Sequence, residues 1–270
     1  MTQLSVAAPV RLSIRGNVVR AVYPAVLVGA VILIAWELAV HLFNIQPYLL
    51  PAPSAIVAEF GKSFSTIASA AQITTIAVIG GALLGAATGV IAAFIVALFE
   101  KFANTVLVLV AILSCAPVVA LAPIFNAWFG ATSLMSKIAV AAIMVFFPVM
   151  VATTKGLLSV HPLHRELMES LSASRFQLMV WVRIPGAVPS LFDGMRVGAT
   201  LSVIGIIVAE YFGGTANALG VLIANSAALS QFPLTWAAVA AASLLGLVVY
   251  GAVMLIERLV APWRFTPASR

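Results

Sequence analysis

The chain has 270 residues, of which 63% are hydrophobic and only 8% are charged. Soluble domains contain about 25% charged and 45–50% apolar residues, so this composition excludes an ordinary soluble protein and indicates a polytopic membrane protein. A formal net charge of +6 would suggest a nucleic-acid partner for a soluble chain. Basic residues scattered between apolar segments instead record orientation in a membrane, and we expect no nucleic-acid partner.

The apolar segments suffice for about six membrane crossings of about 20 residues each. The predicted spans are residues 22–43, 66–98, 103–125, 136–155, 187–212 and 232–257. The third contains Pro117 and Pro123, which predict a kinked or partly re-entrant segment. The expected fold class is all-α, with residues 22–257 as one transmembrane domain in membrane lipid.

Residues 1–21 are predicted to be a cytoplasmic tail, because the apolar stretch after them is too long for a cleaved signal peptide. Residues 258–270 are predicted to be a cytoplasmic tail as well. With both termini inside, two of the 14 basic residues, Lys62 and Lys137, lie outside, which leaves twelve on the inner side and satisfies the positive-inside rule. The twelve are Arg11, Arg15, Arg20, Lys101, Lys155, Arg165, Arg175, Arg183, Arg196, Arg258, Arg264 and Arg270.

The first external segment, residues 48–54, contains Pro51 and Pro53 and is predicted to form a turn. Ser54 at its end is predicted to cap a short helix. In the second span, Gly81, Gly85 and Gly89 recur every four residues, and Gly194 and Gly198 repeat that spacing in the fifth. Small residues at this spacing let two helix backbones approach closely in lipid. We therefore expect these glycines to pack helices within or between subunits.

The longest polar interruption lies between the fourth and fifth spans, at residues 164–185. Leu163, Leu167 and Leu171 fall at i, i+4 and i+8, which predicts a short amphipathic helix. Ser174 begins a capping-box pattern and so predicts a second short helix, which we expect Pro185 to end. Two such helices between spans form a rigid projection with an apolar face, suited to docking in a groove on a partner.

This stretch resembles the EAA loop of ATP-binding cassette (ABC) importer permeases. The family pattern is Glu-Ala-Ala, three residues, Gly, nine residues, then Ile-x-Leu-Pro. The matching positions here are Glu166, Ser172, Val182, Ile184 and Pro185. The spacing is intact.

Two departures from the pattern affect the bend between the helices. Leu167 and Met168 replace the two alanines, and Ser172 replaces the glycine. The bend must therefore form without a glycine, although a serine can cap the helix that follows.

Other segments resemble the permeases of nitrate, sulfonate, taurine and pyrimidine-precursor importers. They are the Leu-Pro-Ala-Pro-Ser segment at residues 50–54, Trp128-Phe129-Gly130 and the later Lys137. The likeness extends from Trp36 to Glu257 and so covers most of the chain.

The resemblance implies the permease subunit of an ABC importer in the bacterial cytoplasmic membrane, expected to work as a homodimer. Cytosolic ATPase subunits, which carry the ATP and Mg, would dock on the loop at residues 159–185. A periplasmic or lipid-anchored binding protein would deliver a small organic solute or anion, of the sulfonate, taurine, nitrate, thiamine-precursor or riboflavin type. The expected ATPase-coupling residues are Leu163, Glu166, Leu167, Glu169, Leu171, Ser172, Ala173, Ser174, Arg175, Phe176 and Pro185.

Charged side chains inside spans are costly and usually functional. Asp193 and Arg196 lie three residues apart at the start of the fifth span, a spacing that allows a structural ion pair near the cytoplasmic end. Together with Glu210 they are the candidate pathway or gate residues. Glu37 and Glu210 lie toward the outer ends of their spans, where either side chain can extend to the interface.

Two other classes stay open at this point. An ion-coupled secondary transporter or channel subunit needs a polar track at mid-membrane and commonly an inverted repeat, and an intramembrane enzyme needs a nucleophile with a base or a metal set. Gly61-Lys62-Ser63 ends like a phosphate-binding loop, but Ile56 occupies the first glycine position. The sequence therefore predicts no catalytic residue, no metal ligand and no cofactor in this chain.

Overall fold

The structure, a computed structural model, describes residues 14–214 and 217–264, without the side chains of residues 14–22, 25 and 119. The described residues form helices and connecting turns, and none of them forms a strand. The helices are α1 (Ile14–Leu42), α2 (Pro53–Lys62), α3 (Phe64–Leu98), α4 (Glu100–Ser114), α5 (Ala122–Phe129), α6 (Leu134–Leu158), α7 (Pro162–Ser170), α8 (Arg175–Leu178), α9 (Ile184–Tyr211), α10 (Leu219–Ala228) and α11 (Phe232–Val260). Three short turns complete the chain: 3-10 turns η1 (Val118–Leu121) and η3 (Pro262–Arg264), and π-helical turn η2 (Met179–Arg183).

Four helical stretches of the described chain are long and apolar enough to cross a membrane. They are Phe64–Leu98, Leu134–Leu158, Arg175–Tyr211 and Phe232–Val260, which match the predicted second, fourth, fifth and sixth spans. The predicted first span coincides with a shorter apolar stretch, Val26–Leu42. The all-α membrane fold is confirmed, whereas the count of six spans is not.

The predicted third span, residues 103–125, is two helices rather than one. Helix α4 ends at Ser114, and α5 begins at Ala122 after η1. Pro117 lacks a backbone N–H and disfavours the helical conformation in the residue before it, which separates the two helices. Pro123 lies in the first turn of α5, where a missing N–H costs little. The predicted interruption of this span is confirmed at Pro117, whereas Pro123 interrupts no helix.

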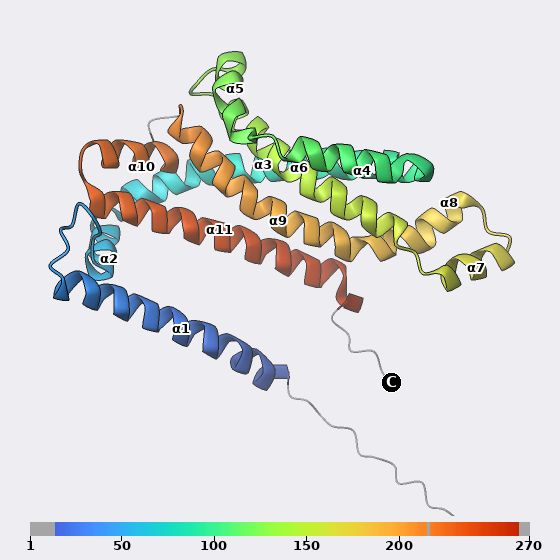
Figure 1. Cartoon of the computed structure of the whole chain (residues 1–270), viewed down its shortest axis with the longest axis horizontal. Helices are drawn as coiled ribbons and strands as arrows, with labels where there is room; N and C mark the ends of the chain where they lie inside the picture. The colour runs from blue at the N-terminus through green and yellow to red at the C-terminus, as the bar shows by residue number, and fades with distance from the viewer. Residues whose placement is uncertain (1–13, 215–216, 265–270) are drawn as a thin grey trace, which may run out of the picture.

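The long helices lie roughly along one axis, with α7 and α8 at one end and α2, α5 and α10 at the other (Figure 1). Helix α6 packs against both α3 and α9. A Cβ atom added to Gly85 of α3 would lie 2.3 Å from the carbonyl oxygen of Ala142, and one added to Gly194 of α9 would lie 2.7 Å from that of Pro148. Both predicted glycine rows therefore pack against α6 within this chain.

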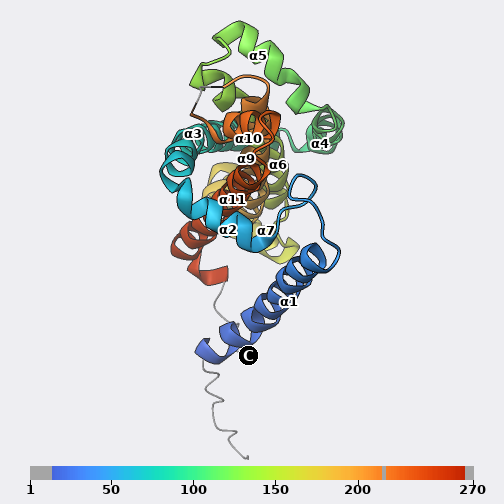
Figure 2. The same ribbon diagram turned by 90° about the vertical axis from the view of Figure 1, so that its left-hand side faces the viewer.

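Helix α1 extends away from the other helices (Figure 2) and is attached near its C-terminal end. The Trp36 ring meets that of Trp236 on α11 edge to face, with centroids 5.5 Å apart. The Glu37 carboxylate accepts hydrogen bonds from the Ser54 backbone N–H at 3.0 Å and hydroxyl at 2.6 Å. The prediction that Ser54 caps α2 is wrong, because Ala52 is the N-cap residue. Glu37 instead binds the first turn of α2, where a helix favours negative charge.

Pro185 does not end the second short helix as predicted. The chain is continuously helical from Arg175 to Tyr211, because α8 passes through the π turn η2 into α9. Pro185 lies in the first turn of α9, where proline is tolerated. Helix α8 and the candidate membrane span α9 are therefore one continuous element.

We predict that Gly85→Ala lowers the unfolding temperature in detergent by several degrees, since the new methyl group overlaps the Ala142 carbonyl and overpacking typically costs about 1–3 kcal/mol. Gly251→Ala on α11 is the matched control, because nothing lies within 4 Å of its Cβ position. Thermal unfolding followed by size-exclusion fluorescence measures both variants. Equal unfolding temperatures for Gly85→Ala and wild type would contradict the proposed tight contact.

Candidate functional site

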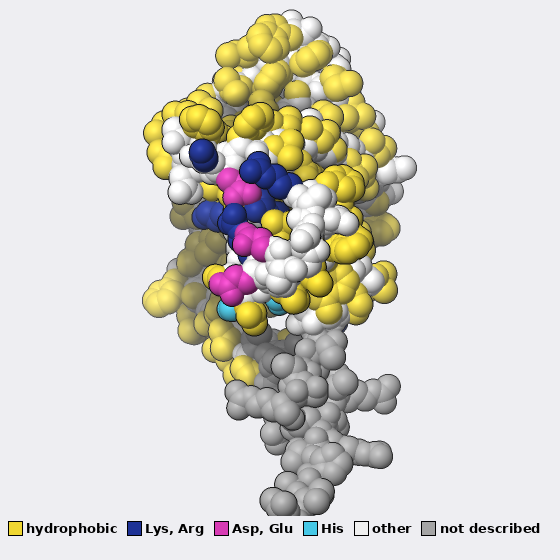
Figure 3. Space-filling view, turned by 90° about the vertical axis from the view of Figure 1, so that its right-hand side faces the viewer, with side chains coloured by type: hydrophobic (Ala, Val, Ile, Leu, Met, Phe, Trp, Pro, Cys, Tyr) yellow, Lys and Arg dark blue, Asp and Glu magenta, His cyan; other side chains and the backbone are white. Residues whose placement is uncertain are grey.

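Helices α7 and α8 project from one end of the molecule (Figure 1). Lys and Arg side chains gather with acidic ones on this end (Figure 3). The predicted apolar row of α7 faces outward, because Leu163, Leu167 and Leu171 are 63%, 56% and 67% exposed. Met168, which lies about 100° around the helix from Leu167, is buried. The sequence therefore identified the free apolar face of α7 correctly.

The two ends of α7 are fixed by local hydrogen bonds. The His161 side chain accepts from the Leu163 N–H at 3.2 Å and caps the N-terminus. At the C-terminus, the Ser172 N–H donates to the Glu169 carbonyl and the Ala173 N–H to the Met168 carbonyl, each at 2.9 Å. These two bonds form a Schellman motif, which requires a left-handed residue at its centre. Ser172 is that residue, with φ of 51°.

The predicted capping box of α8 is present. The Gln177 backbone N–H donates to the Ser174 hydroxyl at 3.2 Å, and the Ser174 N–H donates to the Gln177 side chain at 2.7 Å. Ser174, rather than Ser172, therefore caps this helix. Phe176 and Trp181 are 76% and 67% exposed beyond the cap, so the apolar surface of the projection continues from α7 onto α8 and η2.

A groove of about 750 Å³ separates the projection from the turn between α3 and α4. One charged contact spans it: an Arg183 Nη atom donates to the Glu100 carboxylate at 2.6 Å. The Arg183 side chain is 8% exposed and Glu100 is 47% exposed. Sequence reasoning missed this pair, because 83 residues separate the partners and no local pattern connects them.

A cluster of four charged residues joins α9 to α11 and η3. The predicted contact between Asp193 and Arg196 is present at 3.3 Å, but it is part of a larger set. Glu257, fully buried, accepts hydrogen bonds from both Arg196 and Arg264. Arg264 also bonds Asp193, at 3.1 Å. We name these four residues the inner ion cluster. Sequence reasoning missed Glu257 and Arg264. A single carboxylate near the end of an apolar span could have identified Glu257 as a candidate, because charges in spans are usually paired or functional.

Glu210 lies in a second polar network, at the end of the molecule opposite the inner ion cluster. It is 2% exposed, so the prediction that its side chain extends to the interface is wrong. Its carboxylate accepts hydrogen bonds from the Thr74 hydroxyl at 2.9 Å and the Gly220 N–H at 2.8 Å. Thr74 in turn accepts from the Leu219 N–H at 3.0 Å. Glu210 and Thr74 together hold the first turn of α10 against α9 and α3.

Lys137, predicted to lie on the outer side, is also buried at this end, at 3% exposure. Its Nζ atom donates to the Asn126 side chain at 2.9 Å and to the Ala131 carbonyl at 2.5 Å. These contacts attach α6 to α5 and to the loop that follows it. The Trp-Phe-Gly segment lies between Asn126 and Ala131, the two partners of Lys137, and therefore belongs to one structural unit with it.

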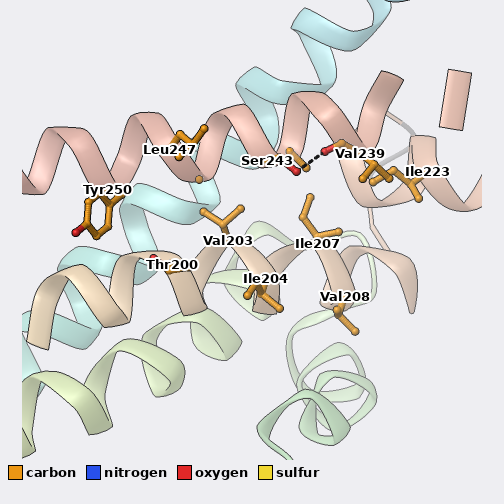
Figure 4. A pocket seen from close by; sticks show the side chains of 12 residues that line it. Thr200, Val203, Ile204, Ile207, Val208, Ile223, Val239, Ser243, Leu247 and Tyr250 are labelled. Atoms are coloured by element: carbon orange, nitrogen blue, oxygen red, sulfur yellow. Dashed lines mark hydrogen bonds between the residues drawn. The ribbon is translucent and has the colours of Figure 1, made fainter. Parts of the chain in front are cut away.

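A groove of about 520 Å³ runs between α9 and α11 and reaches α10. Val203 and Ile207 point from α9 toward α11, and Tyr250 extends from α11 toward α9 (Figure 4). None of its lining residues carries a charge. Glu210, Asp193 and Arg196, the candidate pathway or gate residues, are not among them.

Comparison with known proteins agrees with this architecture. Residues 85–264 match the family described as binding-protein-dependent transport system inner membrane component. A formylaminopyrimidine transport permease protein from Halalkalibacterium halodurans is 32% identical over 86% of this chain and 92% of its own length. A riboflavin transport system permease protein from Chloroflexus aurantiacus is 32% identical over 86% of this chain and 87% of its own length.

A putative aliphatic sulfonates transport permease protein from Bacillus subtilis is 30% identical over 88% of this chain and 86% of its own length. The family match covers well over half of the chain, and these relatives are similar along nearly their whole lengths. With its all-helical membrane fold, the chain belongs to the binding-protein-dependent inner membrane components, the permease subunits of ABC transporters.

Proposed function

We propose that this chain forms the solute pathway of an ABC importer in the bacterial cytoplasmic membrane, and that α7 and α8 couple it to ATP hydrolysis by partner subunits. The observation that carries the proposal is the exposed leucine row of α7, on a projection continuous with a membrane helix. A docked ATPase that moves α8 would move α9 with it, since no break separates them. Rigid-body movement of this kind is a common way to switch access.

The charge distribution supports a cytoplasmic location for the projection. Lys101, Lys155, Arg175 and Arg258 belong to helix ends near α7 and α8, whereas Lys62 and Lys137 belong to the opposite end. The positive-inside rule favours the first group on the cytoplasmic side. The binding protein would then approach the end formed by α2, α5 and α10, and a second copy of the chain would complete the pathway.

The names of the relatives indicate what kind of solute to expect. They include a formylaminopyrimidine, riboflavin and aliphatic sulfonates, all of which are small organic molecules. We propose a small organic solute for this chain too. Family membership favours an ATP-driven permease over an ion-coupled secondary transporter or channel.

The coupling role predicts that Leu171→Asp reduces ATPase copurification from mild detergent by about tenfold or more, because a charge on a docking face must lose its water. Leu229→Asp is the matched control. Leu171 and Leu229 each follow the last residue of a helix, and they are 67% and 69% exposed, but Leu229 follows α10, at the opposite end of the molecule. It should retain the ATPase. Full ATPase binding and wild-type transport in Leu171→Asp would refute the docking role.

Ser172→Gly is predicted to be tolerated and to raise stability slightly. The left-handed conformation costs a non-glycine residue about 1 kcal/mol, and glycine also restores the family residue. Thermal unfolding and solute-stimulated ATP hydrolysis are the readouts. A severe loss of coupling in Ser172→Gly would mean that the hydroxyl itself is needed.

The inner ion cluster predicts that Glu257→Gln destabilises the protein strongly, by about 3–5 kcal/mol, because it leaves two arginines without their buried counter-charge. The double variant Arg196→Gln with Glu257→Gln should be less unstable than the sum of the single changes. Glu169→Gln, which removes an exposed pair with Arg165, should have little effect. Denaturation in detergent measures these three variants, Arg196→Gln alone and the wild type, and additive losses would argue against a coupled pair.

A further inference from the structure

The groove between α9 and α11 has the size of a small-molecule site. Its volume of about 520 Å³ lies within the range of about 300–1,000 Å³ found for ligand pockets. Its walls are mostly branched aliphatic side chains, among them Val203, Ile207, Ile223 and Leu247. Such walls favour an apolar or aromatic body in the occupant.

Three hydroxyl groups give the groove a limited polar capacity. The Thr200 hydroxyl donates to the Arg196 carbonyl at 3.2 Å, and the Ser243 hydroxyl donates to the Val239 carbonyl at 3.0 Å. Both oxygens can still accept a hydrogen bond. Tyr250 also lines the groove, and its hydroxyl makes no hydrogen bond within the part of the chain that the structure describes. The groove therefore suits an occupant that carries N–H or O–H donors.

The charged residues closest along the chain are already bound to one another. Arg196 lies one turn from Thr200, but its guanidinium bonds Asp193 and Glu257. Glu210, near the α10 end, is engaged by Thr74 and Gly220. Helical backbone N–H groups are likewise used inside the helices. An anionic solute in this groove would lose water and meet no cation, which costs several kcal/mol.

We propose that this groove is one wall of the solute pathway and that the solute is an uncharged molecule built on an aromatic ring with N–H or O–H groups. This proposal rests on the proposed function. It restricts the expected solutes to one chemical class on the basis of the residues that line the groove. A flat ring fits between aliphatic walls, and the Tyr250 ring offers an edge or face for contact. A lipid acyl chain would fill the apolar part but use none of the three hydroxyls.

Gly246 permits a direct test, because it lines the groove and the only heavy atom within 4 Å of its Cβ position is Val203 Cγ1, at 4.0 Å. Gly246→Leu should fill the groove without displacing a backbone. Gly251→Leu is the matched control: it lies on the same helix, has nothing within 4 Å of its Cβ position and does not line the groove. Both changes improve helix propensity equally.

The complete importer, with its ATPase and binding protein, is reconstituted in liposomes. Uptake of labelled hydroxymethylpyrimidine and riboflavin is compared with uptake of taurine and nitrate. We expect uptake of at least one uncharged ring compound and of neither taurine nor nitrate. Gly246→Leu should lower that uptake by about tenfold, with ATPase copurification unchanged, while Gly251→Leu transports as wild type.

Each other result has a defined meaning. Uptake of taurine or nitrate, or of neither ring compound, overturns the solute class. Wild-type uptake in Gly246→Leu overturns the groove assignment and identifies a lipid-facing surface. If the wild-type chain fails to copurify with an ATPase, the proposed function fails. If the ATPase copurifies and both glycine variants transport as wild type, only the groove assignment fails.

Discussion

The close contact of α6 with α3 on one side and α9 on the other is the constraint on which the rest of the structure depends. Between helices in lipid there is no hydrophobic driving force of the kind that operates in water, so close backbone approach and dispersion contacts supply the attraction. The Cβ positions of Gly81, Gly85 and Gly198 lie 2.3 to 3.0 Å from atoms of α6. Larger side chains there would separate the helices.

This core positions the functional parts because α9 belongs to it. The same continuous helix begins at the exposed projection, passes the inner ion cluster, forms one wall of the groove and ends at Glu210. The π turn η2 makes that continuity possible, since the helix passes directly from α8 through Pro185 into the span. A bend there would have separated the exposed projection from the groove mechanically.

Local patterns allowed several elements to be predicted well. The leucine row of α7, the capping box at Ser174 and the glycine rows each depend on spacing within one helix, and each is present. Errors arose where contacts between distant residues decide the outcome. Ser54 has the chemistry of an N-cap but binds Glu37, and Glu210 is near a span end but is buried by Thr74 and α10.

Proline was the other source of error, because its effect depends on its position in the helix. Pro117 separates α4 from α5, as its missing N–H and steric demands lead one to expect. Pro185 and Pro123 lie in first turns and break nothing. The sequence alone does not reveal that a π turn precedes Pro185. In the structure η2 packs against α9 and α6, and its Arg183 contacts Glu100, 83 residues away.

The charged contacts at the end of the molecule that carries α7 and α8 differ in how easily their partners can be separated. Glu100 is 47% exposed, so solvent can reach its carboxylate, and the cost of separating this pair falls on Arg183, which is 8% exposed and would lose its one counter-charge in this contact. Glu257 is fully buried beneath two arginines, and separating it would leave an unpaired charge. A displacement of α8 and α9 would therefore release the α3–α4 turn more readily than α11. The two walls of the groove would therefore move together.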